Sequence, residues 1–91
     1  MPYILPEQRE IINQEILALV DKAKTIPDFK ANRGGILNYI ITKIALEFLG
    51  EKSYKSLSLM RSAMEDASAE WYRKQLVPYE EMKIKINGDV E

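Results

Sequence analysis

The side chains able to carry chemistry in this chain are carboxylates, tyrosines, arginines and lysines, because it has no cysteine and no histidine. Their absence removes thiolate nucleophiles, Cys/His zinc sites and the group best suited to proton transfer at neutral pH. The carboxylates of Glu65 and Glu70 have the spacing of surface ion pairs, with Arg61 and Lys74 respectively. No EF-hand spacing and no nucleophile-elbow glycines are present. We therefore expect a non-enzymatic protein without metal or cofactor; an enzyme built on carboxylates, tyrosine and a metal is a third alternative.

The segment from Asn32 to Gly35 is a candidate anion site, because it leads directly into an apolar, helix-like run. Free backbone N–H groups at a helix start, together with the Arg33 guanidinium, suit a phosphate or carboxylate. The segment lacks the glycine spacing of a Walker or dinucleotide fingerprint. The alternative is that Asn32 caps the helix and the glycines only form the turn.

Aromatic and cationic side chains gather between Trp71 and Tyr79. The rings of Tyr72 and Tyr79 offer flat faces to a base or a peptide, and the Arg73 guanidinium suits phosphate or carboxylate. In the alternative interpretation, Trp71 packs in the core and Arg73 complements a helix C-terminus. We favour the core position for Trp71 and leave the other residues open.

The elements that position these residues are helices of one small domain. The chain has 91 residues, of which 46% are hydrophobic and 30% charged, as in ordinary soluble proteins. With a net charge of −1, no overall field attracts it to a nucleic-acid duplex. Neither a signal peptide nor a membrane-spanning segment is evident, so we expect a cytoplasmic protein that does not enter a membrane.

Apolar spacing and helix-breaking residues predict an all-α three-helix bundle with a short extended N-terminal arm. Pro6 suits a first helical turn, Gly50 a left-handed position after a helix, and Pro78 disfavours helix at the residue before it. The helices are expected at residues 6–24, 35–49 and 55–77, within a single domain 1–91 that ends in a tail, 78–91.

The tail alternates Met82, Ile84 and Ile86 with lysines, which is the period of a strand. Asn87-Gly88 is a strong hairpin signal, but too few residues follow it to form a return strand. A strand here would have to pair with the N-terminal arm or with another chain. A partly helical or loosely ordered terminus is the alternative.

Apolar residues exceed what one face of each helix can hold, which predicts a homo-oligomer. The third helix carries an a/d seam with alternating steps of three and four residues. This seam consists of Leu57, Met60, Met64, Ala67 and Trp71. Its partner is a helix of the same chain or of a second copy.

Gly35 to Thr42 reads G-x-L-N-Y-x-I-T, Glu70 to Lys74 is close to E-x-Y-R-R, and Pro78 to Val90 reads P-Y-E-x-x-K-I-x-x-N-G-D-V. In these three motifs the chain resembles a family of small uncharacterised phage, prophage and bacterial proteins. Lys74 stands where the pattern has Arg, and Met82 where it has a polar residue. The family supplies no activity. The resemblance implies which residues matter: Asn38, Tyr39, Thr42, Tyr72, Arg73, Tyr79, Glu80, Lys83, Asn87 and Asp89.

Asn38 and Thr42 form a polar stripe on an apolar helix, so their side chains need partners. The tail could fold back on them as a structural lock, or they could face a ligand between subunits. The resemblance favours a phage-type accessory protein, in the host cytoplasm, with an anti-defence role. Our first hypothesis is that it sequesters an anionic nucleotide immune signal at an oligomer interface; the alternative is a helical protein–protein module that inhibits a host protein or serves phage morphogenesis. The candidate ligand-binding residues are Arg33, Asn38, Tyr39, Thr42, Tyr72, Arg73, Tyr79 and Lys83.

Overall fold

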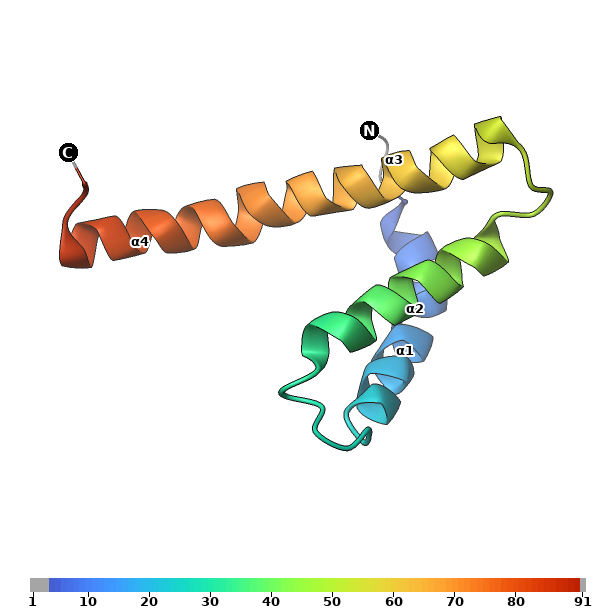
Figure 1. Cartoon of the computed structure of the whole chain (residues 1–91), viewed down its shortest axis with the longest axis horizontal. Coiled ribbons are helices and arrows are strands. Elements are labelled where there is room, and N and C mark those ends of the chain that lie inside the picture. Colours follow the sequence, from blue (N-terminus) through green and yellow to red (C-terminus); the bar gives the residue numbers. More distant parts are fainter. Residues whose placement is uncertain (1–3, 91) are drawn as a thin grey trace. The chain divides into compact units, whose positions relative to one another are not determined.

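The computed structural model describes residues 4–90, and these residues form helices without any strand (Figure 1). The predicted all-α class with three helices is confirmed, because the last three elements join end to end into one continuous helix. The elements are α1 (Pro6–Ala23), α2 (Arg33–Phe48), α3 (Tyr54–Trp71), the π-helical segment η1 (Tyr72–Leu76) and α4 (Val77–Asn87). We call the continuous helix Tyr54–Asn87 the long helix.

The chain divides into two compact units rather than a uniformly connected whole. Unit 1 covers residues 1–48 and contains α1 and α2, and unit 2 covers residues 49–91 and contains the long helix. The prediction of a single domain stays a prediction. Most of the expected N-terminal arm lies outside the described residues, and Leu5 at its end has extended backbone angles.

Local signals explain both ends of α1. Pro6 occupies the first turn, where its missing N–H costs nothing, and the N–H of Leu5 donates to Oε1 of Gln8 at 2.7 Å. At the other end, the Thr25 hydroxyl donates to the Lys22 carbonyl at 2.6 Å, and Pro27 follows shortly after. The predicted start at residue 6 is confirmed.

The connection from α1 to α2 is organised around Asp28, which has a left-handed backbone with φ 59°. Its carbonyl accepts the backbone N–H groups of Ala31 and Asn32, each at 3.1 Å, and the Asn32 side-chain amide at 3.2 Å. After α2, Gly50 has φ 69°, the left-handed conformation predicted from the sequence.

A reciprocal serine pair begins the long helix. The Ser53 hydroxyl oxygen accepts the N–H of Ser56 at 3.1 Å, and the Ser56 hydroxyl oxygen accepts the N–H of Ser53 at 3.0 Å. Ser53 is thus the cap of the long helix, with Ser56 as its counterpart. Two orphan donors of the first turn are satisfied in this way.

The third helix does not end near Val77, and the tail is a helix rather than a strand. In a regular α-helix, Pro78 would clash with the carbonyl four residues earlier and leave it unpaired. The chain avoids this clash by widening the turn before Pro78, so that the N–H of Val77 donates to the Tyr72 carbonyl five residues back. Asn87-Gly88 then ends a helix instead of forming a hairpin, and the Gly88 N–H donates to the Ile84 carbonyl at 2.8 Å.

Burial is sparse in the described residues, where Ala23 is the one buried side chain, at 8% exposure. Phe29, Ile36 and Ile40 are half-buried, and most of the larger apolar side chains are exposed. Trp71 is 64% exposed, which corrects the expectation that it packs in a core. Within the described residues of unit 2, no second helix is present that could cover Trp71. Among the described helices, none has the length and apolar character needed to cross a membrane.

Candidate interaction groove

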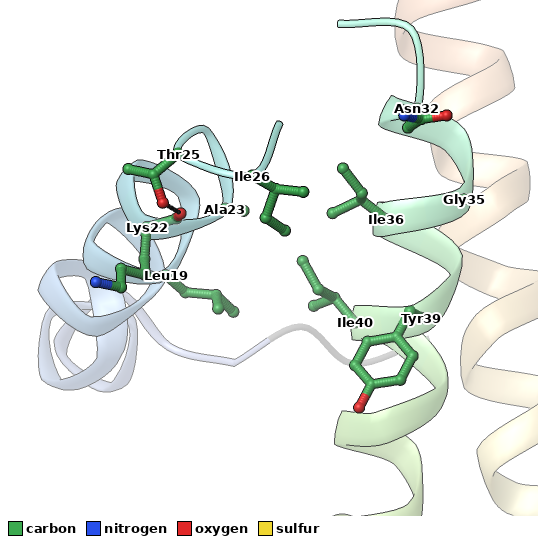
Figure 2. A pocket seen from close by; sticks show the side chains of 10 residues that line it. All are labelled: Leu19, Lys22, Ala23, Thr25, Ile26, Asn32, Gly35, Ile36, Tyr39 and Ile40. Carbon is green, nitrogen blue, oxygen red and sulfur yellow. Dashed lines mark hydrogen bonds between the residues drawn. The ribbon is translucent and has the colours of Figure 1, made fainter. Parts of the chain in front are cut away.

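Unit 1 contains an open groove of about 580 Å³ between the C-terminal half of α1 and the N-terminal half of α2 (Figure 2). Its walls are mainly aliphatic. Figure 2 shows Leu19 and Ile26 on one side, with Ile36 and Ile40 directed toward them from the other. The complete lining is Leu19, Lys22, Ala23, Thr25, Ile26, Asn32, Gly35, Ile36, Tyr39 and Ile40.

Helical spacing explains why these side chains meet. Leu19 and Ala23 are one turn apart on α1, and Ile36 and Ile40 are one turn apart on α2, so each pair shares a face. Ile26 comes from the connection and points into the space between the helices (Figure 2). The hydrogen bonds around Asp28 hold this connection and so position the two walls.

Polar side chains lie at the rim of the groove and are engaged with their own backbone. The Thr25 hydroxyl donates to the Lys22 carbonyl, and the Asn32 amide donates to the Asp28 carbonyl. Figure 2 shows the Lys22 ammonium directed away from Ile36 and Ile40. The interior therefore suits an apolar group, and no cation faces it.

The predicted anion site at the start of α2 has its polar side chains turned back into the preceding turn. Nε of Arg33 donates to the Lys30 carbonyl at 3.1 Å, as Asn32 does to Asp28. The backbone carbonyl of Asn32 accepts the Ile36 N–H at 3.0 Å, which is the first hydrogen bond of α2, while its side-chain amide is bonded to Asp28. Nothing lies within 4 Å of a Cβ added at Gly34 or Gly35, so packing does not require glycine there. Anion binding stays a prediction.

The other three candidates on α2 are Asn38, Tyr39 and Thr42, and their side chains have different surroundings. The Thr42 hydroxyl donates to the side-chain oxygen of Asn38 at 3.4 Å, so the two residues of the polar stripe are hydrogen-bonded to each other. Tyr39 is the one candidate ligand residue that lines the groove. The proposed lock between this stripe and the tail stays a prediction, although the tail's helical conformation is now known.

The remaining four candidates lie along the long helix of unit 2. Arg73 forms an ion pair with Glu70, whose second oxygen is 3.3 Å from the Lys74 ammonium. The Lys83 ammonium is 5.6 Å from the centroid of the Tyr79 ring, within cation–π range. Tyr72 and Tyr79 are about half exposed. The eight candidate residues thus form two groups, one in each unit.

The carboxylates are used in local ion pairs, as their spacing predicted. Arg61 and Glu65 are joined at 2.8 Å, Glu70 pairs with Lys74, and Lys43 lies 3.9 Å from Glu47. Within residues 4–90, no group of three or more Asp and Glu side chains is placed to hold a metal ion.

Sequence reasoning missed the groove itself. The apolar stripes containing Leu19, Ile36 and Ile40 were visible, and their unusual width indicated more than one neighbour. Which stripe faces which depends on the turn at Asp28, and an aspartate with positive φ has no clear sequence signal.

The comparisons place the chain among proteins of unknown activity. A family model described as a domain of unknown function, DUF6899, matches residues 1–90. The chain belongs to this family. Neither the curated proteins nor the solved structures give a match. The resemblance to an uncharacterised family is therefore confirmed at that level, and the family description assigns no catalytic activity to its members.

Proposed function

We propose that the chain is a non-enzymatic protein–protein interaction module, and that its groove receives the apolar face of a helix from a partner protein. The observation that carries this proposal is the aliphatic groove of about 580 Å³ in a unit whose described residues, 4–48, include one buried side chain. Each Ile or Leu side chain that a partner covers fully is worth about 1.5–3 kcal/mol. Covering a few of them supplies the free energy of a specific complex.

The polar groups of the groove favour a helix over a small molecule. Small-molecule sites combine apolar walls with a few convergent polar groups that fix the ligand's orientation. Here the side chains of Thr25 and Asn32 donate hydrogen bonds to nearby backbone carbonyls, and so they do not converge on the groove. Apolar recognition between two helices is instead typical of an amphipathic helix docked through residues one turn apart.

Two isoleucine variants on the same helix test this proposal. Ile40→Glu places a charge in the groove, whereas Ile41 is the next residue and does not line it. We expect wild type and Ile41→Glu to capture the same stoichiometric partner protein from bacterial host lysate. Ile40→Glu is expected to capture at least about tenfold less of this partner, because burial of an unpaired charge is costly. Circular dichroism controls for folding. Equal capture by both folded variants contradicts the proposal.

The phage-type motifs support a more specific role, as an accessory protein that binds a host protein. The test is a plaque assay in defence-carrying cells that express the chain. We expect wild type and Ile41→Glu to restore plaque formation by a sensitive phage, and Ile40→Glu to fail. Equal plaque numbers with and without the wild-type chain contradict the anti-defence role while leaving the module itself unaffected.

Nucleotide sequestration is the second candidate function. It is supported by the half-exposed rings of Tyr72 and Tyr79 and by the nearby Lys83, which together offer stacking faces and a cation along one helix. Calorimetric titration against cyclic and ADP-ribose-type nucleotides tests it. We expect heat from at least one nucleotide and a loss of that heat in Tyr79→Ala. No heat from any member of the panel rejects this candidate.

A further inference from the structure

The long helix carries an apolar seam that continues through the π-helical segment. In α3, the seam residues follow one another in steps of three and four, from Leu57 to Trp71. Such steps keep side chains on one face, since each residue turns the helix by about 100°. In a regular α-helix beyond Trp71, a turn of about 100° per residue would bring Gln75, Pro78, Met82 and Lys85 nearest to that face. Of these four, Met82 alone has a large apolar side chain.

The π-helical segment changes which residues continue the seam. It adds one residue to a turn, so the step after Trp71 is five residues and all later positions shift by one. The face then carries Leu76, Tyr79, Lys83 and Ile86. Lys83 is the one charged residue among these four, and its ammonium lies over the ring of Tyr79. One mostly apolar seam therefore runs from Leu57 to Ile86.

The length of this seam determines what can cover it. The long helix has parts of 18, 5 and 11 residues, and is about 50 Å long at about 1.5 Å per residue. The helices of unit 1 have 18 and 16 residues, about 27 and 24 Å, and they lie on opposite sides of the groove instead of end to end. Neither matches the seam in length. A second copy of the long helix does.

We propose that two copies of this chain associate through antiparallel pairing of their long helices along this seam. Antiparallel helices have opposed dipoles, which favours the pairing. When they overlap fully, each Arg61 lies opposite Glu80 of the second copy, and both residues border the seam on the same side. Near the midpoint, the large Trp71 lies beside the small Ala67 of the other copy. A parallel pair instead brings identical charges to the same height.

The exposed area suits a stable dimer. Six of the larger seam side chains are 38–67% exposed, namely Leu57, Met64, Trp71, Leu76, Tyr79 and Ile86. Two helices in contact over about 50 Å bury an area within the class of about 1,200–2,000 Å² that specific interfaces need. This dimer surface is separate from the groove of unit 1, so the proposal does not rest on the function proposed above.

Solution mass gives the first test. By light scattering at micromolar concentration, the wild-type chain is expected at twice its 10.5 kDa mass. Met64→Glu is expected to weaken the dimer at least about hundredfold, because it buries two unpaired carboxylates. Ser62→Glu, on the opposite face of α3, is the matched control and is expected to leave the mass unchanged. A wild-type particle of single-chain mass overturns the proposal, as does equal dissociation of both variants.

Introduced cysteines test the orientation, and the absence of native cysteine makes the result unambiguous. In the antiparallel pair, Leu57 lies near Lys83 of the second copy, whereas within one helix these residues are about 39 Å apart. Oxidation of the double variant Leu57→Cys/Lys83→Cys is expected to give a covalent dimer, and each single variant is expected to give none. A covalent dimer of Leu57→Cys alone indicates parallel pairing and overturns the proposed orientation. No cross-link in the double variant of a dimeric protein does the same.

Discussion

The two units form their helices through the same kinds of caps and turns, but they differ in what covers the apolar side chains of those helices. Unit 1 sets two helices on either side of a groove and fixes them through a turn rich in hydrogen bonds. Unit 2 is one uninterrupted helix with a seam and no second helix of its own. The comparison shows that caps and turns are enough to define helix ends, but that burial requires a neighbouring chain segment. Isolated helices are marginal in water, and the long helix has less cover within its own unit than α1 and α2 have in theirs.

The largest expected effect comes from removing the reason for the π-helical segment. Pro78→Ala restores an N–H at residue 78 and removes the ring, so regular α-helix becomes possible. The seam beyond Trp71 then loses Leu76, Tyr79 and Ile86, and each loss costs about 1.5–3 kcal/mol of burial. We expect the dimer to weaken at least about hundredfold, although alanine is the better helix former.

Dilution series of the folded variant and of Pro6→Ala measure this effect. Pro6 occupies a first turn, where proline is well tolerated, so its replacement is expected to leave the dimer unchanged. An undiminished dimer in Pro78→Ala shows that the seam does not depend on the π-helical turn.

Hydrogen exchange measured at two protein concentrations sharpens the comparison between the units. If dissociation opens the long helix, its amides exchange through a monomer whose fraction rises with the square root of dilution. A hundredfold dilution is then expected to speed exchange about tenfold in residues 54–87. Exchange in α1 and α2 is expected to change less. Identical behaviour of both units removes the distinction drawn between them.

The smallest effect concerns the start of the long helix. Ser53→Ala removes the oxygen that accepts the Ser56 N–H and is expected to lower the free energy of unfolding by about 1 kcal/mol. Ser58→Ala, within α3 and away from the cap, serves as the control, with an expected change below about 0.5 kcal/mol. Urea titration at fixed protein concentration gives both values. A larger loss in the control indicates that the helix start is not set by its cap.

The sequence was a good guide where a local signal has one structural solution. Pro6 and Gly50 each mark a helix end, and the structure uses both as predicted. Pro78 is compatible with two structures, because a helix can end before a proline or can continue through it with a wider turn. Widening also changes the helical phase, which no count of three- and four-residue steps reveals. The strand-like alternation of Met82, Ile84 and Ile86 was therefore a misleading guide to a helical tail.

The candidate site was predicted less well for a related reason. Residue types indicated ligand contacts at Arg33 and Arg73, and the resemblance indicated one at Asn38, but the structure pairs these side chains with nearby carbonyl, carboxylate and hydroxyl groups. Such short-range pairing depends on side-chain rotamers, which the sequence does not specify. Tyr39 was a candidate because the family resemblance implied it, and it does line the groove.

The carbonyl oxygen of Asp28 has a consequence for the shape of the groove. Three donors from residues 31 and 32 converge on this single atom, at a left-handed position that aspartate tolerates and most residues do not. The direction in which α2 leaves the connection depends on this position. A substitution at residue 28, which does not line the groove, can therefore alter the width of the opening while every lining residue stays the same.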